Sequence, residues 1–208
     1  MKRIIKGTEP HCLLQYRQIE GANYDGYHPK EPLKRALLAE QGYICCYCMR
    51  RISEANMEIE HWQPESKYPE LQINYKNLLA SCSGNRGTSK SNQHCNPRKG
   101  DIEITINPAD SKNCEIYIKY SSTGKIFSDN STIDYELNEV LNLNFQTLKE
   151  NRKTELDTVI NALNKKFPNK TWTKEEIKKK IDEFNCKDLE GKYKPYCQHI
   201  IYYLSKRL

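Results

Sequence analysis

Four cysteines stand at positions from which they could bind one metal ion together. Cys45 and Cys48 form a C-x-x-C pair, and Cys82 and Cys95 follow further along the chain. Four thiolates are a ligand set that a structural zinc ion takes in tetrahedral geometry. We therefore expect a zinc site that joins the early pair to the later segment. A lone C-x-x-C pair would be equally compatible with redox chemistry or with unligated buried thiols.

The interval between these cysteines carries further polar groups in a defined order. Glu60-His61 comes first, Asn77 follows before two leucines, and the run CNPRKG occupies 95–100. This order resembles the zinc-bound HNH endonuclease family in its H-N-N variant. The resemblance makes His61, Asn77 and Asn96 the three motif residues. It implies an α+β fold in which a ββα-metal core (HNH, or His-Me finger) with a structural zinc ion is followed by a C-terminal helical extension.

The resemblance gives these residues roles in hydrolysing a phosphodiester. A base must take a proton from the attacking water, and a histidine with a pKa near neutrality suits that task, so His61 is the expected general base. A divalent cation must neutralise charge on the phosphate oxygens, and Mg²⁺ or Mn²⁺ prefers oxygen ligands. Glu60 and Asn96 are the expected ligands of that cation. Taken alone, His61 would be read as a hydrogen-bonded structural histidine, and only the neighbouring motif residues argue for catalysis.

Three more roles follow from the same resemblance. Asn77 is expected to hold its loop and the His61 ring in register without touching the cation. Lys99 and Arg98 lie where a cationic side chain would meet the scissile phosphate. The general base, the cation ligands and the phosphate contacts are thus all expected close to the zinc site.

Two features differ from the usual pattern of that family. Glu60 stands where the family more often has Asp, which lengthens this ligand by one methylene group. Twelve residues separate Cys82 from Cys95, where the family usually has a second C-x-x-C pair. His94 is therefore an open alternative to one of the thiols as a zinc ligand. Cys95 is preferred because the residues after it keep the family spacing.

A narrower resemblance covers nearly the whole chain. Its motifs are similar to those of PtuB-type HNH proteins, which work in Septu anti-phage defence beside an ATPase called PtuA, and some of which accompany retrons. The resemblance implies a PtuA-like ATPase as partner, oligomeric assembly through that ATPase, and docking by the helices from Tyr135 onward. The motifs are Tyr24-Asp25, Glu40-Gln41-Gly42, Glu60-His61-Trp62-x-Pro64, Asn107-Pro108, VLNLN at 140–144, Leu148 and Asn151-Arg152.

Local patterns predict the elements that position the site. From Glu31, apolar residues at helical spacing predict a helix that stops near Gly42 and leads into Cys45. Three further patterns fill the interval up to the last cysteine. They predict a hairpin of two strands in YICCYC (43–48) and MEIEHW (57–62), a short helix or turn in NYKNLLASC (74–82), and a mobile surface loop in SGNRGTSKSNQ (83–93). A final turn or short helix is expected at 94–99.

The second half of the chain changes from strand to helix patterns. CEIYIKYSSTGKIF (114–127) predicts a second hairpin, and helices follow from Tyr135, one of them opened by a capping box at 173–176. The chain is expected to divide into an N-terminal arm and leading helix (1–43), a nuclease core (44–105), and a hairpin with a helical extension for partner docking (106–208).

Composition sets weaker bounds. The 208 residues carry a net charge of +6, which supports a polyanionic partner only modestly. No stretch is apolar enough to cross a bilayer, and the N-terminus has no apolar signal region, so we expect a cytoplasmic protein without membrane contact. In such a reducing compartment, an odd count of nine cysteines argues for metal binding by some of them rather than a disulfide framework.

Three functions remain open on these grounds. The first is a DNA endonuclease that uses a divalent cation. The second is a catalytically silent zinc module that binds nucleic acid or scaffolds the ATPase. The third is a ribonuclease with the same site, because hydrolysis by an activated water neither needs nor excludes the 2′-hydroxyl of RNA.

Overall fold

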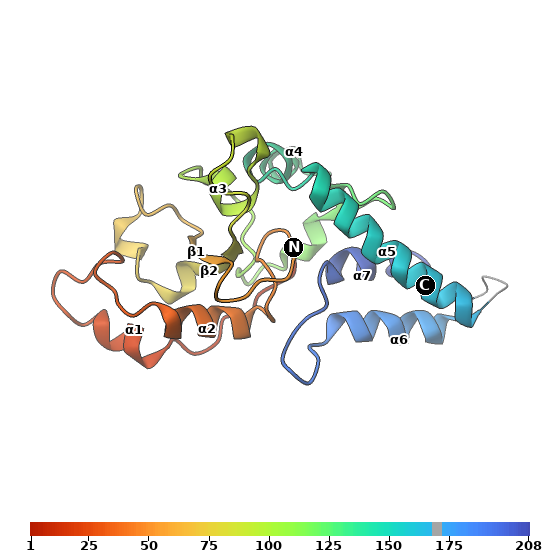
Figure 1. Cartoon of the computed structure of the whole chain (residues 1–208), viewed down its shortest axis with the longest axis horizontal. Coiled ribbons are helices and arrows are strands. Elements are labelled where there is room, and N and C mark those ends of the chain that lie inside the picture. Colours follow the sequence, from red (N-terminus) through yellow and green to blue (C-terminus); the bar gives the residue numbers. More distant parts are fainter. Residues whose placement is uncertain (168–171) are drawn as a thin grey trace.

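The structure is a computed structural model that describes residues 1–167 and 172–208. The molecule is elongated, with α1, α2 and the β1–β2 sheet towards one end and the helices α5 to α7 towards the other (Figure 1). Its helices and strands are α1 (His11–Tyr16), α2 (Glu31–Glu40), β1 (Met57–His61), β2 (Leu78–Cys82), α3 (Cys95–Lys99), β3 (Lys119–Tyr120), β4 (Ile126–Phe127), α4 (Ser131–Tyr135), α5 (Gln146–Lys166), α6 (Lys174–Asn185) and α7 (Cys197–Ser205). Short 3₁₀ turns lie between them, and a π-helical turn, Glu136–Val140, follows α4.

The centre of the N-terminal half is a two-stranded antiparallel sheet covered by helices. β1 pairs with β2 in a register that sets Met57 opposite Cys82 and His61 opposite Leu78. Every residue of β2 is buried, because α2 and α3 both pack against this strand. The chain therefore mixes helices with few, short strands, as an α+β class requires, and a short helix follows the antiparallel pair.

The predicted pairing of YICCYC with MEIEHW is wrong. The first run forms a turn in which Ile44 makes only an isolated bridge with Arg51, and Met49 takes a left-handed conformation (φ 62°). The partner of β1 is instead β2, in a segment whose pattern suggested a helix or turn. The physical reason is burial: the apolar run that begins at Leu78 lies between two helices, and a strand can bury both of its faces there.

Other expected elements appear where the sequence puts them. The leading helix is α2, which buries Leu33, Leu37 and Leu38. The second hairpin is present as β3 and β4, although it is shorter than expected, because Cys114–Tyr117 forms a 3₁₀ turn. The cap of α6 is also present, with the Thr173 hydroxyl accepting a hydrogen bond from the Glu176 amide.

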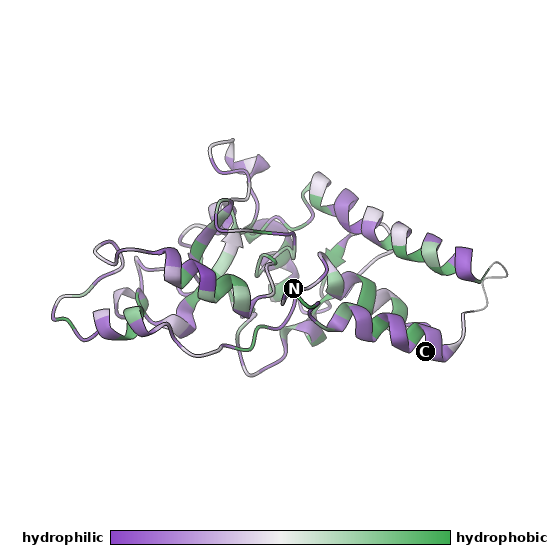
Figure 2. Cartoon of the chain, turned by 60° about the horizontal axis from the view of Figure 1, so that its bottom comes forward, coloured by the Kyte–Doolittle hydropathy of each residue, from purple (hydrophilic) through white to green (hydrophobic). Residues whose placement is uncertain are grey.

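The helical extension is held by apolar faces that meet one another. α6 and α7 pack together, and α7 also contacts α5 and β3. Figure 2 shows that these helices carry hydrophobic and hydrophilic residues on different sides. Within the described residues, no helix combines the length and the apolar character that a bilayer crossing would need.

Arg152 is the buried polar anchor of this extension. It is 1% exposed, and its guanidinium donates to the carbonyl oxygens of Gly124 at 2.6 Å and Leu143 at 2.7 Å. We expect Arg152→Ala to lower the free energy of unfolding by about 3 kcal/mol, because two buried carbonyls lose their charge-assisted donors. Urea denaturation of the zinc-loaded protein would measure it.

A matched control is Arg35→Ala. Arg35 forms an ion pair with Glu54 in which both side chains are largely exposed. Its loss should cost less than about 0.5 kcal/mol, because exposed pairs contribute little. Equal unfolding midpoints for the two variants would contradict the anchoring role of Arg152.

Candidate zinc centre and hydrolytic site

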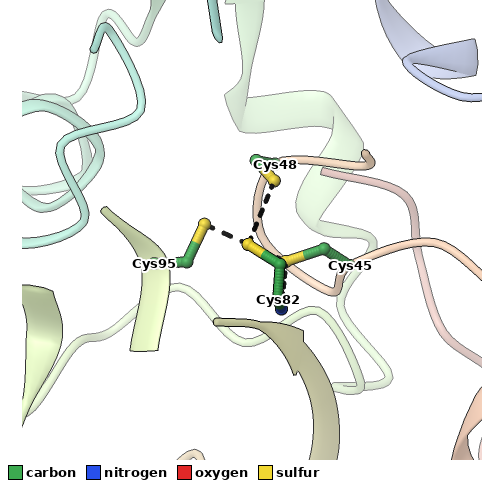
Figure 3. A group of neighbouring side chains, drawn as sticks. All are labelled: Cys45, Cys48, Cys82 and Cys95. Atoms are coloured by element: carbon green, nitrogen blue, oxygen red, sulfur yellow. Dashed lines mark hydrogen bonds between the residues drawn. The ribbon is translucent and has the colours of Figure 1, made fainter. Parts of the chain in front are cut away.

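The four predicted zinc ligands meet in the folded chain. The sulfur atoms of Cys45, Cys48, Cys82 and Cys95 all lie within 4.8 Å of one another and are buried (Figure 3). Cys45 and Cys95 have their sulfurs 3.9 Å apart, and Cys48 and Cys82 have theirs 3.8 Å apart. A tetrahedral zinc ion with Zn–S bonds of about 2.3 Å has S···S edges of about 3.8 Å. These residues therefore fit a bound zinc ion.

The ligands come from three segments that the zinc site joins. Cys45 and Cys48 lie on the turn after α2, Cys82 ends β2, and Cys95 begins α3 with a left-handed φ of 57°. The turn is fixed to the sheet through the hydrogen bond from the Cys46 amide to the Ala80 carbonyl, at 3.0 Å.

A close backbone contact brings the fourth ligand to the third. The His94 amide donates to the Gly84 carbonyl at 3.0 Å. A Cβ at Gly84 would lie 1.9 Å from the His94 carbonyl oxygen, so this position requires glycine. The long segment between Cys82 and Cys95 thus returns to its starting point, and the unusual spacing of the second cysteine pair becomes compatible with one site.

His94 lies beside the cluster rather than within it. It is 2% exposed, and its Nδ1 is 3.2 Å from the Cys95 sulfur and 3.9 Å from the Cys82 sulfur. The four thiols already complete a tetrahedral set. The geometry therefore favours Cys95 as the ligand, with His94 as its hydrogen-bonding neighbour.

The cluster also favours a thiolate. Burial opposes ionisation of the Cys45 thiol, but hydrogen bonds from the surrounding thiols outweigh it and hold the pKa of Cys45 well below its usual range. By contrast, burial and the charge of its neighbour raise the pKa of Cys46. Burial also raises the pKa of Cys95, so the positions of the four sulfur atoms, rather than these pKa directions, identify the ligand set.

His61 ends β1 in an orientation defined by one backbone group. Its Nε2 lies 2.8 Å from the carbonyl oxygen of Gln72, and its ring meets the Tyr24 ring edge-on at 4.5 Å. A carbonyl can only accept, so Nε2 carries the hydrogen and the neutral ring has its lone pair on Nδ1. Burial lowers the pKa of His61, although the Gln72 carbonyl opposes this effect. Burial therefore favours the neutral ring, in which the Nδ1 lone pair can accept a proton.

Asn77 braces the loop that presents this carbonyl. It is 5% exposed, its amide oxygen accepts from the Gln63 amide at 2.8 Å, and its amide nitrogen donates to the carbonyls of Gln63 at 3.0 Å and Leu71 at 3.3 Å. Gln63 and Leu71 lie at the two ends of the loop that leads to Gln72. Asn77 thus holds the backbone of the loop that leads to Gln72, and it makes no hydrogen bond to the His61 ring within the described residues.

Glu60 and Lys99 form a buried ion pair. Lys99 is 1% exposed, and its ammonium lies 2.9 Å from the Glu60 carboxylate and donates to the His61 carbonyl oxygen at 3.0 Å. The Tyr47 hydroxyl donates to the same carboxylate oxygen at 2.7 Å. Burial raises the pKa of Glu60 and the Lys99 charge opposes that rise. Lys99 was expected at the scissile phosphate, but the structure places it inside, as the partner of Glu60.

Asn96 contacts the carboxylate of Glu58 rather than that of Glu60. Its amide nitrogen donates to Glu58 at 2.9 Å, and Arg86 binds the same carboxylate oxygen at 2.6 Å. Within the described contacts, the structure does not bring Glu60 and Asn96 together. The amide oxygen of Asn96 makes no hydrogen bond to any described residue, so it can coordinate a metal ion. Glu60, with its paired and buried carboxylate, does not fit the role of a cation ligand in this arrangement.

Arg98 is partly buried and engaged by backbone groups. It donates to the carbonyls of Glu139 at 3.1 Å and Lys90 at 2.8 Å, which joins α3 to the turn after α4.

The sequence analysis did not identify two side chains that contact the predicted site residues: Glu58, which binds Asn96, and Tyr47, which binds Glu60. Strand alternation could have indicated the first, because Glu58 and Glu60 share one face of β1. No signal in the sequence singles out Tyr47, apart from its place between two zinc ligands.

Comparison with known proteins gives two curated relatives, whereas no family model matches the chain. The Septu protein PtuB of Bacillus thuringiensis is 33% identical over 117 residues, which are 55% of this chain and 42% of that protein. The "Retron Vc95 putative HNH endonuclease" of Vibrio cholerae serotype O1 biovar El Tor is 29% identical over 177 residues, 74% of this chain and 82% of that protein. The chain thus spans less than half the length of the PtuB relative. By these similarities the chain is a relative of HNH-type proteins.

Proposed function

We propose that this chain is a metal-dependent HNH endonuclease that hydrolyses phosphodiester bonds in DNA, with β1, β2 and α3 as its ββα-metal core. The observation that carries the proposal is the orientation of His61. Its Nε2 donates to the Gln72 carbonyl, and Nδ1 makes no hydrogen bond to any residue that the structure describes, so Nδ1 can act as the base. The names of the two relatives support the same reaction class.

In the proposed reaction, His61 takes a proton from the attacking water at Nδ1. The Gln72 carbonyl then stabilises the imidazolium, because it already accepts from Nε2. Asn77 keeps that carbonyl in place by bracing its loop. A Mg²⁺ or Mn²⁺ ion, when bound, supplies charge neutralisation at the phosphate. The amide oxygen of Asn96 is one donor toward it.

Of the two cationic side chains expected at the scissile phosphate, Arg98 and Lys99, Arg98 remains the candidate for that contact. It is only partly buried, whereas Lys99 is enclosed.

We further propose that residues 106–208 dock a PtuA-like ATPase and that oligomers assemble through that partner. The support is the resemblance to PtuB-type proteins and the Septu PtuB relative.

The test is cleavage of supercoiled plasmid DNA by the zinc-loaded protein with Mg²⁺ or Mn²⁺, beside a single-stranded RNA substrate, for the wild type and His61→Ala. Nicking that depends on the divalent cation and on His61 is the expected result. If only the RNA is cleaved, RNA rather than DNA is the substrate. Binding that weakens steeply with salt, without cleavage under any divalent ion, would favour the silent zinc module.

The pH dependence of cleavage follows from the surroundings of His61. The base must be neutral, and burial lowers the pKa of His61 below its usual 6.5. We expect kcat/KM to rise with pH through that lowered pKa and to be on its plateau by neutral pH. A pH–rate profile at saturating cation measures this. A midpoint above the usual histidine pKa would contradict a neutral, partly buried base.

A further inference from the structure

Tyr24 is the aromatic neighbour of the proposed base, and it comes from the segment between α1 and α2, residues 17–30. Its ring meets the His61 ring edge-on, with the two ring centroids 4.5 Å apart. The Tyr24 amide also donates to the side-chain oxygen of Gln72 at 2.8 Å, and the backbone carbonyl of the same Gln72 accepts from His61. The segment is therefore fixed to the residue that orients the base.

Lys30 brings a positive charge to this arrangement. Its ammonium lies over the Tyr24 ring, 3.8 Å from the ring centroid. The largest possible separation between this ammonium and the centre of the His61 ring is therefore the 3.8 Å and the 4.5 Å placed end to end. The Lys30 charge also acts on the base: burial is the main cause of the lowered pKa of His61, and the charge of Lys30 adds to it.

The backbone of Lys30 is held at the start of α2. Lys30 is the cap residue of that helix, and its carbonyl accepts a hydrogen bond from the Lys34 amide at 3.0 Å. The helix packs against β2, which pairs with the strand that carries His61. Lys30 is therefore anchored at both ends, at its backbone by α2 and at its ammonium by the Tyr24 ring.

The charge of Lys30 remains available to an anion. Its ammonium forms no hydrogen bond or ion pair with any residue that the structure describes, and the side chain is only partly buried. The carboxylates of Glu65 and Asp25 lie near the same ring, since they add to the effect of burial in raising the pKa of Tyr24 to about 12. Neither carboxylate forms an ion pair with Lys30 in the described contacts. A cation–π contact attracts an ammonium without neutralising it.

The position of this ammonium suits the phosphate that would react. The attacking water lies at hydrogen-bond distance from the base, about 2.8 Å, and about 3–3.5 Å from the phosphorus atom. A phosphate in that place lies within about 6 Å of the His61 base nitrogen. Its oxygens can then accept charge-assisted hydrogen bonds from an ammonium that stands beside the same ring.

We propose that Lys30 binds the phosphate on which His61 acts, and that Tyr24 is the positioning residue that holds both side chains. The proposal deepens the proposed endonuclease function and rests on it. It gives the site a second cation beside Arg98, in place of the enclosed Lys99. It also gives a role to residues 17–30, which lie outside the ββα core.

The first experiment measures binding of a short fluorescein-labelled DNA duplex to the zinc-loaded full chain, by fluorescence anisotropy at several KCl concentrations and without Mg²⁺ or Mn²⁺. Lys30→Gln should reduce the slope of log K against log [KCl] by about 0.9, the value for one lost phosphate contact. Lys178→Gln is the matched control. Lys178 is exposed on α6, in the other half of the molecule (Figure 1), so its loss removes the same charge and should leave the slope unchanged.

The second experiment measures nicking of plasmid DNA with Mg²⁺ by the same variants. Lys30→Gln should lower kcat/KM by about tenfold or more, because a charge-assisted hydrogen bond to the phosphate is lost. Lys30→Arg keeps a cation at this position and should restore most of the rate. Tyr24→Phe keeps the ring under the ammonium and should cleave like the wild type, because the hydroxyl group makes no hydrogen bond to any described residue.

A wild-type salt slope together with wild-type cleavage in Lys30→Gln would overturn the inference. An equal loss of slope in Lys178→Gln would also overturn it, because the effect would then come from net charge alone. Zinc content and circular dichroism establish that each variant is folded. The binding measurement needs no cleavage, so a slope that depends on Lys30 in a wild type that cuts no DNA would count against the proposed function and not against the phosphate contact. Cleavage that depends on His61 but not on Lys30 would count against this inference alone.

Discussion

Replacing His61 with alanine is expected to reduce cleavage of plasmid DNA by about 10²–10⁴-fold, the usual contribution of a positioned general base. The side chain is partly buried and makes one hydrogen bond, to the Gln72 carbonyl at 2.8 Å. Its removal therefore takes away the base without opening a large cavity. The zinc content should stay at one ion per chain, because none of the four thiols contacts the ring in the described hydrogen bonds. Initial nicking rates and metal analysis of the same preparation measure both quantities.

His11→Ala is the matched control for this variant. His11 is an exposed histidine at the start of α1, and its loss should leave the cleavage rate unchanged. A residual rate in His61→Ala equal to that of the wild type would remove His61 from the mechanism. A loss of zinc in the variant would instead mean that the rate fell because the core was damaged.

Removing the zinc ion is expected to unfold the core around it. Structural zinc sites have apparent binding free energies of about 10–16 kcal/mol at pH 7, which is comparable with the whole stability of a domain, about 5–15 kcal/mol. The four ligands lie on a turn, at the end of β2 and at the start of α3. Neither of the described β-sheets includes α3 or that turn, so no sheet hydrogen bonds hold the two together. Chelation, or Cys48→Ser, should therefore abolish the cooperative thermal transition of this part of the protein.

Circular dichroism melts with metal analysis test this expectation. Cys186→Ser, at an exposed cysteine, is the control and should keep both the zinc ion and the melting temperature. His94→Ala separates the two possible ligand sets: it should keep one zinc ion per chain if Cys95 is the ligand. A chelated protein that melts like the zinc-loaded one would show that thiol packing alone holds the core.

The sequence indicated the parts of the site that depend on residue type and local spacing. Thiols are chemically distinctive, and the C-x-x-C spacing together with the family resemblance separated Cys45, Cys48, Cys82 and Cys95 from the other five cysteines. These four meet around one point. The leading helix and the cap of α6 were also predictable, because helical periodicity and capping are properties of neighbouring residues.

The tertiary structure decided how distant segments combine. Which strand pairs with β1 depends on the burial of β2 between α2 and α3, and this contact joins segments that the sequence keeps apart. The roles of charged residues were decided in the same way. Lys99 and Glu60 have the residue types of a phosphate contact and a cation ligand, but burial makes them partners of each other. Residue type by itself determines which chemistry a side chain can perform, whereas the low dielectric and the neighbours created by packing determine which charges remain available to a ligand.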